Sequence, residues 1–254
     1  MDLNAVSIAL LAVLGAAVGS FLNVVAYRLP LRQSIVRPRS RCPGCAEQIA
    51  GYDNVPILSW LMLRGHCRNC GAAIPVRYPL IEALTACLFV AVALKVDSFG
   101  ELWPGLVFVS VLVLVAAIDI EHRIVPNRIL APAALTALLL WLLADPERVL
   151  ENLLAGAAAG GFLLVAALAY PGGMGMGDVK LAAVMGFFLG RAVAPAMLIG
   201  FLAGVVVGAG IMAARGISAR KQAIPFAPYL AIGGVVGQLF GSDLINWYLD
   251  ISQG

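Results

Sequence analysis

The sequence predicts an all-α, polytopic membrane protein with about eight transmembrane helices and one sizeable hydrophilic loop. Of its 254 residues, 61% are hydrophobic and 12% are charged, whereas a soluble domain usually has about 25% charged residues. The hydrophobic residues form long apolar stretches. Most of the basic residues lie in those connecting segments that would fall on one side of a membrane. The net charge of +3 is small, so it gives no reason to expect a nucleic-acid partner. The predicted surroundings are a lipid bilayer.

Eight apolar stretches are candidate spans, because a helix needs about 20 mostly apolar residues to cross a bilayer. They cover residues 4–27, 80–96, 102–118, 128–144, 149–169, 179–190, 195–213 and 226–248. The sixth is short, which favours a half-helix or a tilted, protein-buried segment. Glycines four apart, at 15 and 19, 156 and 160, 200, 204 and 208, and 233 and 237, predict close helix packing. The predicted organisation is a first span (1–27), a hydrophilic loop (28–79) and a membrane core (80–254).

The basic residues predict the orientation of the spans, since Lys and Arg are enriched in cytoplasmic loops. If the loop 28–79 is cytoplasmic, only Lys95, Arg148 and Arg191 of the 17 basic residues lie on the opposite side. This asymmetry predicts a multi-pass protein with both termini outside the cytoplasm. It also places two acids, Asp119 and Asp178, on the same cytoplasmic face.

Four of the five cysteines lie in the hydrophilic loop as two CxxC pairs. The pairs are Cys42 with Cys45 and Cys67 with Cys70. Each pair brings two thiolates to one side of a turn, and four thiolates complete the closed, structural site that Zn²⁺ prefers. Gly44 and Gly71 are expected to allow the sharp turns. Disulfides are the alternative, but a reducing cytoplasm disfavours them. The fifth cysteine, Cys87, is expected to be a small packing residue within a span.

Asp119 and Asp178 each lie at the boundary of an apolar stretch. Acids at membrane depth are costly to keep without a partner or a task. If the two helix ends are neighbours, the carboxyl groups share a proton, because two close carboxylates do not ionise together easily. The ionised group can deprotonate a water molecule, while the protonated group donates to a scissile carbonyl oxygen. The alternative is a pair of solvated helix ends; Asp178 suits a helix N-terminus, whereas the helix dipole disfavours Asp119 at a C-terminus.

A glycine-rich segment precedes Asp178. Gly175 and Gly177, with Pro-Gly-Gly at 171–173 before them, are expected to prevent a regular helix there. An extended substrate could then pair with free backbone groups, so Gly175 and Gly177 are candidate substrate-binding residues. The segment matches neither the GxGxxG nor the P-loop pattern, and the chain contains no HExxH helix. With only two histidines, Ser/His/Asp catalysis has little support.

Several short polar or glycine-containing segments follow one another along the chain. They are Gly19–Val24 with Arg28–Pro30, the two CxxC pairs, Asn54–Trp60, Arg77–Glu82, Asp119–His122, Gly175–Lys180 and Pro225–Pro228. In this order they resemble the bacterial type IV prepilin peptidases, membrane aspartic proteases of the GxGD class. The resemblance covers nearly the whole chain, so it is more specific than the GxGD pattern alone. One departure is Asn127, which stands where many relatives have an acid.

The resemblance implies two activities. The first is an endopeptidase that removes the short, basic leader from type IV prepilins and type II secretion pseudopilins, after a glycine, at the cytoplasmic face of the bacterial inner membrane. The second is methylation of the new N-terminal residue with S-adenosylmethionine. The resemblance also implies that Asp119 and Asp178 are the catalytic pair and that the core 80–254 is the transmembrane aspartic protease.

Two other interpretations of these residues stay open. A proton- or cation-coupled transporter would use the same two aspartates as ion sites, although the sequence has no recognisable internal repeat of the kind common in transporters. A membrane-anchored zinc scaffold would depend on the four cysteines and on neither acid. The sequence makes no prediction of the oligomeric state.

Overall fold

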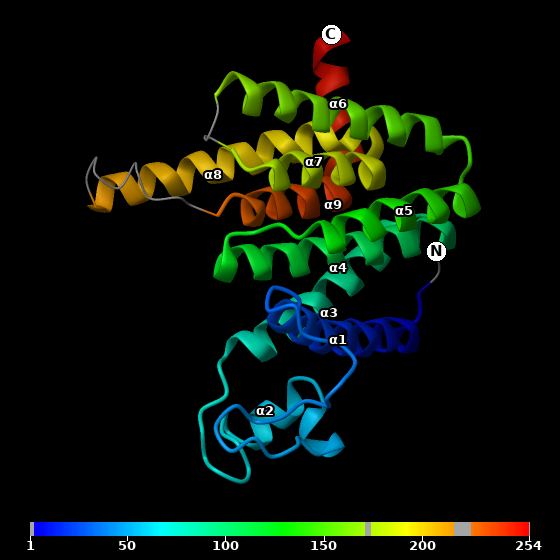
Figure 1. Cartoon of the computed structure of the whole chain (residues 1–254). Coiled ribbons are helices and arrows are strands. Elements are labelled where there is room, and N and C mark those ends of the chain that lie inside the picture. The colour runs from blue at the N-terminus through cyan, green and yellow to red at the C-terminus, as the bar shows by residue number, and fades with distance from the viewer. Residues whose placement is uncertain (1–2, 171–173, 216–224, 254) are drawn as a thin grey trace. The chain divides into compact units, whose positions relative to one another are not determined.

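The structure of the chain, a computed structural model, describes residues 3–170, 174–215 and 225–253. In this part, eight long helices are joined by turns and one longer loop, and the only β-pairing recorded is two isolated bridges. The predicted all-α class is therefore confirmed. The chain divides into two compact units, Met1–Val96 and Asp97–Gly254, and each is described by itself (Figure 1).

The first unit pairs two long helices through glycines. It contains α1 (Ala5–Arg28), η1 (Gly51–Asn54), α2 (Leu58–Met62) and α3 (Arg77–Lys95). A Cβ added at Gly15 would lie 2.7 Å from the Cα of Ala86, and one added at Gly19 would lie 2.7 Å from the Cα of Glu82. The two helices therefore run antiparallel at a separation that only glycine permits, as the spacing of these residues predicted.

Two buried polar side chains hold the first unit together. Asn23, which is 2% exposed, donates from Nδ2 to the backbone oxygen of Tyr78 at 3.1 Å. Glu82, which is 7% exposed, accepts a hydrogen bond from the N–H of Ile57 at 2.7 Å. Ile57 has a φ of +62°, a backbone conformation that β-branched residues rarely adopt. The Glu82 carboxylate thus fixes a strained turn of the loop against α3.

The second unit consists of helices that lie against one another as antiparallel pairs. It contains α4 (Phe99–His122), α5 (Asn127–Ala144), α6 (Arg148–Ala169), α7 (Met176–Leu189), η2 (Gly190–Ala192), α8 (Val193–Arg215) and α9 (Ala227–Gln253). Helix α6 packs along α7, and α8 packs along α9 (Figure 1). Gly156 and Gly186 meet back to back, and Gly200 faces Leu230. The predicted glycine packing is confirmed at Gly156 and Gly200; it is wrong at Gly208, where an added Cβ would meet none of the described residues within 4 Å.

Six helical stretches of the described residues are long and apolar enough to cross a membrane. Five are α1, α3, α4, α5 and α6, and the sixth is the continuous stretch Met176–Ala214. This stretch comprises α7, η2 and α8, which lie side by side (Figure 1) because the chain turns at Gly190, where φ is +56°. The chain is a multi-pass membrane protein. Its eight long helices lie within a few residues of the eight predicted stretches, while the number of actual crossings stays a prediction.

The boundary between the two units differs from the division that the sequence suggested. The sequence grouped residues 80–254 as one core because apolar stretches follow one another closely from that point. The structure instead groups α3 with α1, since Gly15 and Gly19 bring these two helices into contact. Helix packing, which joins segments far apart in the chain, decides this grouping.

Candidate active site and metal site

Asp119 lies in the last turn of α4, and its carboxylate is held by another helix. The side chain is 5% exposed, and its Oδ2 accepts a hydrogen bond from the backbone N–H of Ala227 at 3.1 Å. Ala227 is the first residue of α9, where the N–H groups have no partner inside the helix. Arg123 ends α4 in the left-handed conformation, and its N–H donates to the backbone oxygen of Asp119, which closes the last turn of the helix. The carboxylate is therefore fixed between the end of α4 and the start of α9.

Asp178 lies in the first turn of α7 and is half-buried. Gly175 precedes the helix in extended conformation, and its oxygen accepts a hydrogen bond from the N–H of Asp178 at 3.1 Å. An acid at this position is favoured by the helix dipole. The predicted place of Asp178, at the beginning of an apolar helix, is the place that it occupies.

The segment that follows α4 brings the two acids to the same end of the second unit. A Cβ added at Gly177 would lie 2.7 Å from the Cβ of Val125. The Lys180 ammonium donates to Oδ1 of Asn127 at 3.0 Å. The segment between α4 and α5 thus packs against the first turn of α7. The last turn of α4, which carries Asp119, and the first turn of α7, which carries Asp178, therefore lie at the same end of the second unit.

The glycines before Asp178 have different structural roles. Gly175 is exposed and lies outside the helix, as expected for backbone that a substrate can approach. Gly177, in contrast, lies inside the first turn of α7. The expectation that Gly177 prevents a regular helix is therefore wrong, and the close approach of Val125 gives the physical reason for a glycine there. The predicted role of the Pro-Gly-Gly segment 171–173 lies outside the described residues.

The four cysteines of the loop form one cluster inside the first unit. The sulfur atoms of Cys42, Cys45, Cys67 and Cys70 all lie within 4.8 Å of one another. The two knuckles have matching backbone hydrogen bonds, from Ala46 to Cys42 at 2.8 Å and from Gly71 to Cys67 at 2.9 Å. The left-handed residues that these turns require are Ala46 and Gly71. Gly44 has another role, because a Cβ there would lie 3.1 Å from Ala72 in the opposite knuckle.

The cluster has the dimensions of a metal site. Four sulfur atoms placed tetrahedrally at about 2.3 Å from Zn²⁺ are roughly 3.8 Å apart, and the sulfurs of Cys42 and Cys70 are 3.7 Å apart. Hydrogen bonds from the N–H groups of Cys45 and Gly44 lower the pKa of the Cys42 thiol to about 6, which favours the thiolate that a metal binds. The tetracysteine cluster can therefore hold a metal ion. Cys87 is exposed on α3, so the predicted packing role is not found within its unit.

Two features of the site were missed by reasoning from the sequence. One is the N–H of Ala227, although the surrounding Pro-Phe-Ala-Pro segment was among those that carried the resemblance. The other is the contact of Val125 with Gly177, for which the sequence has no signal, because it depends on how two helix ends meet. Both contacts involve backbone that comes close only after the helices pack.

A multi-pass helical protein with two carboxyl groups at one end of its helices has the features of a membrane-embedded aspartic peptidase. Two family models match the chain: the Bacterial Peptidase A24 N-terminal domain over residues 13–96, and the Type IV leader peptidase family over residues 106–212. The gap between the two matches contains the boundary between the structural units. The chain belongs to the type IV leader peptidase family.

Curated relatives support this assignment over most of the chain. A Prepilin leader peptidase/N-methyltransferase of Bacillus subtilis (strain 168) is 38% identical over 248 residues, which cover 97% of this chain and 100% of that protein. The protein of the same name from Myxococcus xanthus (strain DK1622) is 45% identical over 212 residues, covering 80% of this chain and 63% of the relative. That of Aeromonas salmonicida (strain A449) is 36% identical, covering 91% and 90%. No solved structure matches the chain.

Proposed function

We propose that this protein is a membrane aspartic endopeptidase that removes the basic leader from type IV prepilins and type II secretion pseudopilins and then methylates the new N-terminus. Its relatives are named for both activities. The peptidase half is supported by the positions of Asp119 in the last turn of α4 and Asp178 in the first turn of α7, at the same end of the second unit. Metal-free peptide hydrolysis needs two such acids, from different helices, on either side of the scissile bond.

The catalytic step uses the two carboxyl groups in different protonation states. An ionised carboxylate takes a proton from a water molecule, which attacks the carbonyl carbon of the scissile peptide bond. The other carboxyl group, protonated, donates to the carbonyl oxygen as the tetrahedral intermediate forms. The N–H of Ala227 keeps the Asp119 carboxylate in place through this exchange, because a positioned acid or base is far more effective than a mobile one.

Gly175 gives the substrate a place to bind. It is exposed and extended just before α7, so its backbone is open to an elongated peptide. Gly177 contributes by letting the Val125 segment reach the helix, which keeps the two acids at the same end. A prepilin segment paired with this backbone would have its scissile bond beside Asp178.

The substrate and the orientation of the enzyme fit together. A prepilin is an apolar helix whose basic leader stays in the cytoplasm, so the enzyme must cut at the cytoplasmic face of the inner membrane. The asymmetry of Lys and Arg predicts that both acids and the cysteine loop lie on that face. With eight crossings, both termini are periplasmic.

The metal in the cysteine cluster is Zn²⁺ in this proposal. Four thiolates close the coordination shell, so the ion stabilises the loop and takes no part in hydrolysis. Its contribution is to hold the two knuckles together through the four thiolates.

S-adenosylmethionine would supply the methyl group, but neither of two cavities formed by the described residues fits it. One, of about 470 Å³, is lined by Arg28, Arg37, Arg39 and Arg41, whose charges repel a sulfonium cation. The other, of about 210 Å³, has mainly apolar walls. We therefore assign methylation from the relatives and place no residue in that step. The comparisons give no support to the transporter alternative.

The test is cleavage of a prepilin by the detergent-solubilised protein with labelled S-adenosylmethionine. We expect loss of the leader mass and label at the new N-terminus. Asp119→Asn and Asp178→Asn should each reduce cleavage at least a thousandfold, because each removes one of the two protonation states. Asp250→Asn, the same exchange at an exposed position near the end of α9, is the control and should cleave normally. Full cleavage by either of the first two variants would remove that residue from the catalytic pair.

A further inference from the structure

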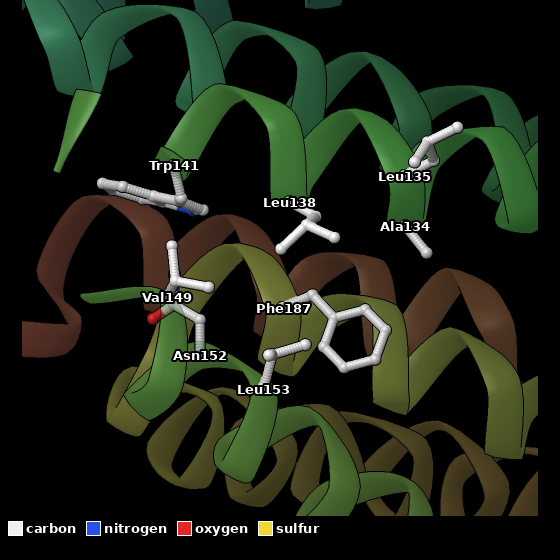
Figure 2. Close-up of a pocket in the computed structure, with 8 residues that line it drawn as sticks. All are labelled: Ala134, Leu135, Leu138, Trp141, Val149, Asn152, Leu153 and Phe187. Carbon is white, nitrogen blue, oxygen red and sulfur yellow. The ribbon is translucent and has the colours of Figure 1, made fainter. Parts of the chain in front are cut away.

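A cavity of about 470 Å³ lies in the first unit, where the chain leaves α1. Its walls are formed by the last two residues of that helix and by residues between 33 and 41. No acidic residue is among the described residues that line it, whereas four arginines are: Arg28, Arg37, Arg39 and Arg41. We call this space the arginine cavity. The cavity between α5, α6 and α7 in the second unit, in contrast, has no charged residue in its walls (Figure 2).

The hydrogen bonds of Ser34 fold the segment after α1 back onto the end of the helix. Nη1 of Arg28 donates to the backbone oxygen of Ser34 at 3.0 Å. Oγ of Ser34 accepts from the N–H groups of Val36 and Arg37 at 3.3 Å and 3.2 Å. The N–H of Gln33 donates to the backbone oxygen of Arg28 at 3.0 Å. This turn holds the segment against the helix end, so the backbone brings the later arginines to the same cavity.

The positive charges of the arginine cavity are not balanced by neighbouring carboxylates. Within the described chain, none of its four arginines forms an ion pair, whereas Arg68 pairs with Asp53 at 2.6 Å and Arg148 pairs with Glu101 at 2.8 Å. A guanidinium group stays charged in proteins, so an uncompensated group of four attracts an anion. Its fork of N–H donors matches the oxygens of a phosphate especially well.

The end of α1 places the arginine cavity at the depth of lipid headgroups. Helix α1 is apolar enough to cross a membrane and has 24 residues. Its length of about 36 Å slightly exceeds the roughly 30 Å of hydrocarbon in a bilayer. The last residues of the helix therefore reach the headgroup region. Tyr27, which lines the cavity and is exposed, is a residue type enriched at that depth.

Exposed apolar side chains lie in the same segment as the arginines. Leu31 is 49% exposed, Ile35 is 38% exposed and Val36 is 76% exposed. Basic residues combined with exposed apolar residues are typical of segments that lie in the interface of a bilayer, where cations meet phosphates and apolar groups meet acyl chains. A soluble anion would pair with the arginines but would leave the apolar side chains in water, which is unfavourable. These side chains therefore favour a lipid as the source of the phosphate.

We propose that the arginine cavity binds the phosphate of an anionic glycerophospholipid, whose hydrocarbon covers Leu31, Ile35 and Val36. The phosphate accepts hydrogen bonds from the guanidinium groups. The choline or ethanolamine cation of a zwitterionic headgroup would meet only like charges among the lining residues, so a headgroup with a net negative charge is preferred. The site belongs to the first unit and uses neither of the two acids of the candidate active site.

The experiment compares phosphatidylglycerol with phosphatidylcholine of identical acyl chains. The purified, delipidated chain is mixed with each lipid over a concentration series, and bound lipid is counted by native mass spectrometry. We expect phosphatidylglycerol to bind about tenfold more tightly, because basic residues near a membrane surface attract anionic lipids. A large excess of inorganic phosphate, with the ionic strength balanced by chloride, should leave the lipid bound. Equal binding of the two lipids, or displacement by inorganic phosphate, overturns the proposal.

Paired variants locate the site within the loop. Arg37→Gln combined with Arg39→Gln removes two of the four charges at exposed positions, so the preference for phosphatidylglycerol should shrink severalfold. Arg39→Gln combined with Arg41→Gln should have the same effect, which keeps the test valid if one protein does not fold. Arg32→Gln combined with Arg64→Gln is the matched control, since these exposed arginines of the same loop are not among the lining residues. An unchanged preference in both cavity variants, or an equal loss in the control, overturns the assignment to the cavity.

Discussion

Gly177 shows how a single residue adjusts the candidate active site. A methyl group there would lie 2.7 Å from the Cβ of Val125, closer than side chains approach in folded proteins. We expect Gly177→Ala to slow prepilin cleavage at least tenfold, because displacing a catalytic group by about 1 Å can cost a hundredfold. The measurement is the initial rate of cleavage per amount of membrane-inserted protein. Gly161→Ala in α6 is the control, because an added Cβ there would meet no described residue outside its own helix backbone within 4 Å. Normal cleavage by Gly177→Ala would contradict the steric argument.

The cysteines give a second prediction at this scale. Cys67→Ser removes one of four sulfur ligands, so bound zinc should fall from about one per chain to a small fraction, as measured by elemental analysis of the purified protein. Cys87→Ser is a matched exchange of a cysteine outside the cluster and should leave the zinc content unchanged. If unsubstituted protein carries no zinc or other ion, the metal proposal fails while the peptidase proposal stands.

Individual residues differ in how far the sequence could predict them. The CxxC spacing is local, so the cysteine cluster could be read directly and is confirmed as a group. The place of Asp119 and Asp178 at helix boundaries is also local. The meeting of these acids was conditional on two helices being neighbours, which no local pattern determines. The role of Gly177 was misjudged for the same reason, since its contact comes from a segment some 50 residues away in the chain.

The start of α9 is the element that acts most directly on the site. Its first N–H, from Ala227, is donated to Asp119. Proline is well suited to the first position of a helix but has no N–H, so Ala227→Pro should keep the helix and remove this hydrogen bond. A hydrogen bond to a charged group is worth about 1.5–3 kcal/mol, so we expect cleavage to fall about tenfold to a hundredfold.

The control for this exchange is Ala227→Gly, which keeps the N–H and should retain most of the activity. Because Ala227 is fully buried, the melting temperature of both variants is measured beside the cleavage rate. An Ala227→Pro protein that melts normally and cleaves at the full rate would show that the hydrogen bond has no part in catalysis.

Helices were predictable where apolar runs are long, and their turns were not. The stretches 102–118 and 149–169 correspond to α4, which extends three to four residues further at each end, and to α6, which begins one residue earlier. The predicted stretches 179–190 and 195–213 already separated α7 from α8, although the residues between these two helices are helical as well. The separation comes from the left-handed backbone at Gly190. At 14 residues, α7 is about 21 Å long, which bears out the expectation of a short sixth helix.

At the scale of the whole molecule, the number of membrane crossings determines whether the C-terminus lies on the same side of the membrane as the N-terminus. A straight helix of 39 residues, the length of Met176–Ala214, would measure about 58 Å, almost twice the roughly 30 Å of hydrocarbon in a bilayer. The turn at Gly190 divides it into α7 and α8, which agrees with the two spans predicted there. The predicted eighth span corresponds to α9, which has 27 residues but is not among the helices that are both long and apolar enough to cross a membrane. Eight crossings return the C-terminus to the side of the N-terminus.

Reporter fusions test this topology. Alkaline phosphatase fused after Gly254 should be active, and green fluorescent protein at the same position should be dark, because both outcomes follow from a periplasmic end. A fusion after Gln33, which follows α1, should give the opposite pair of results. The predicted topology puts fourteen of the 17 basic residues on the same side as Gln33, and basic residues are enriched on the cytoplasmic side. The same sidedness at both positions would mean an even number of crossings after the loop, which would contradict the predicted topology of eight crossings.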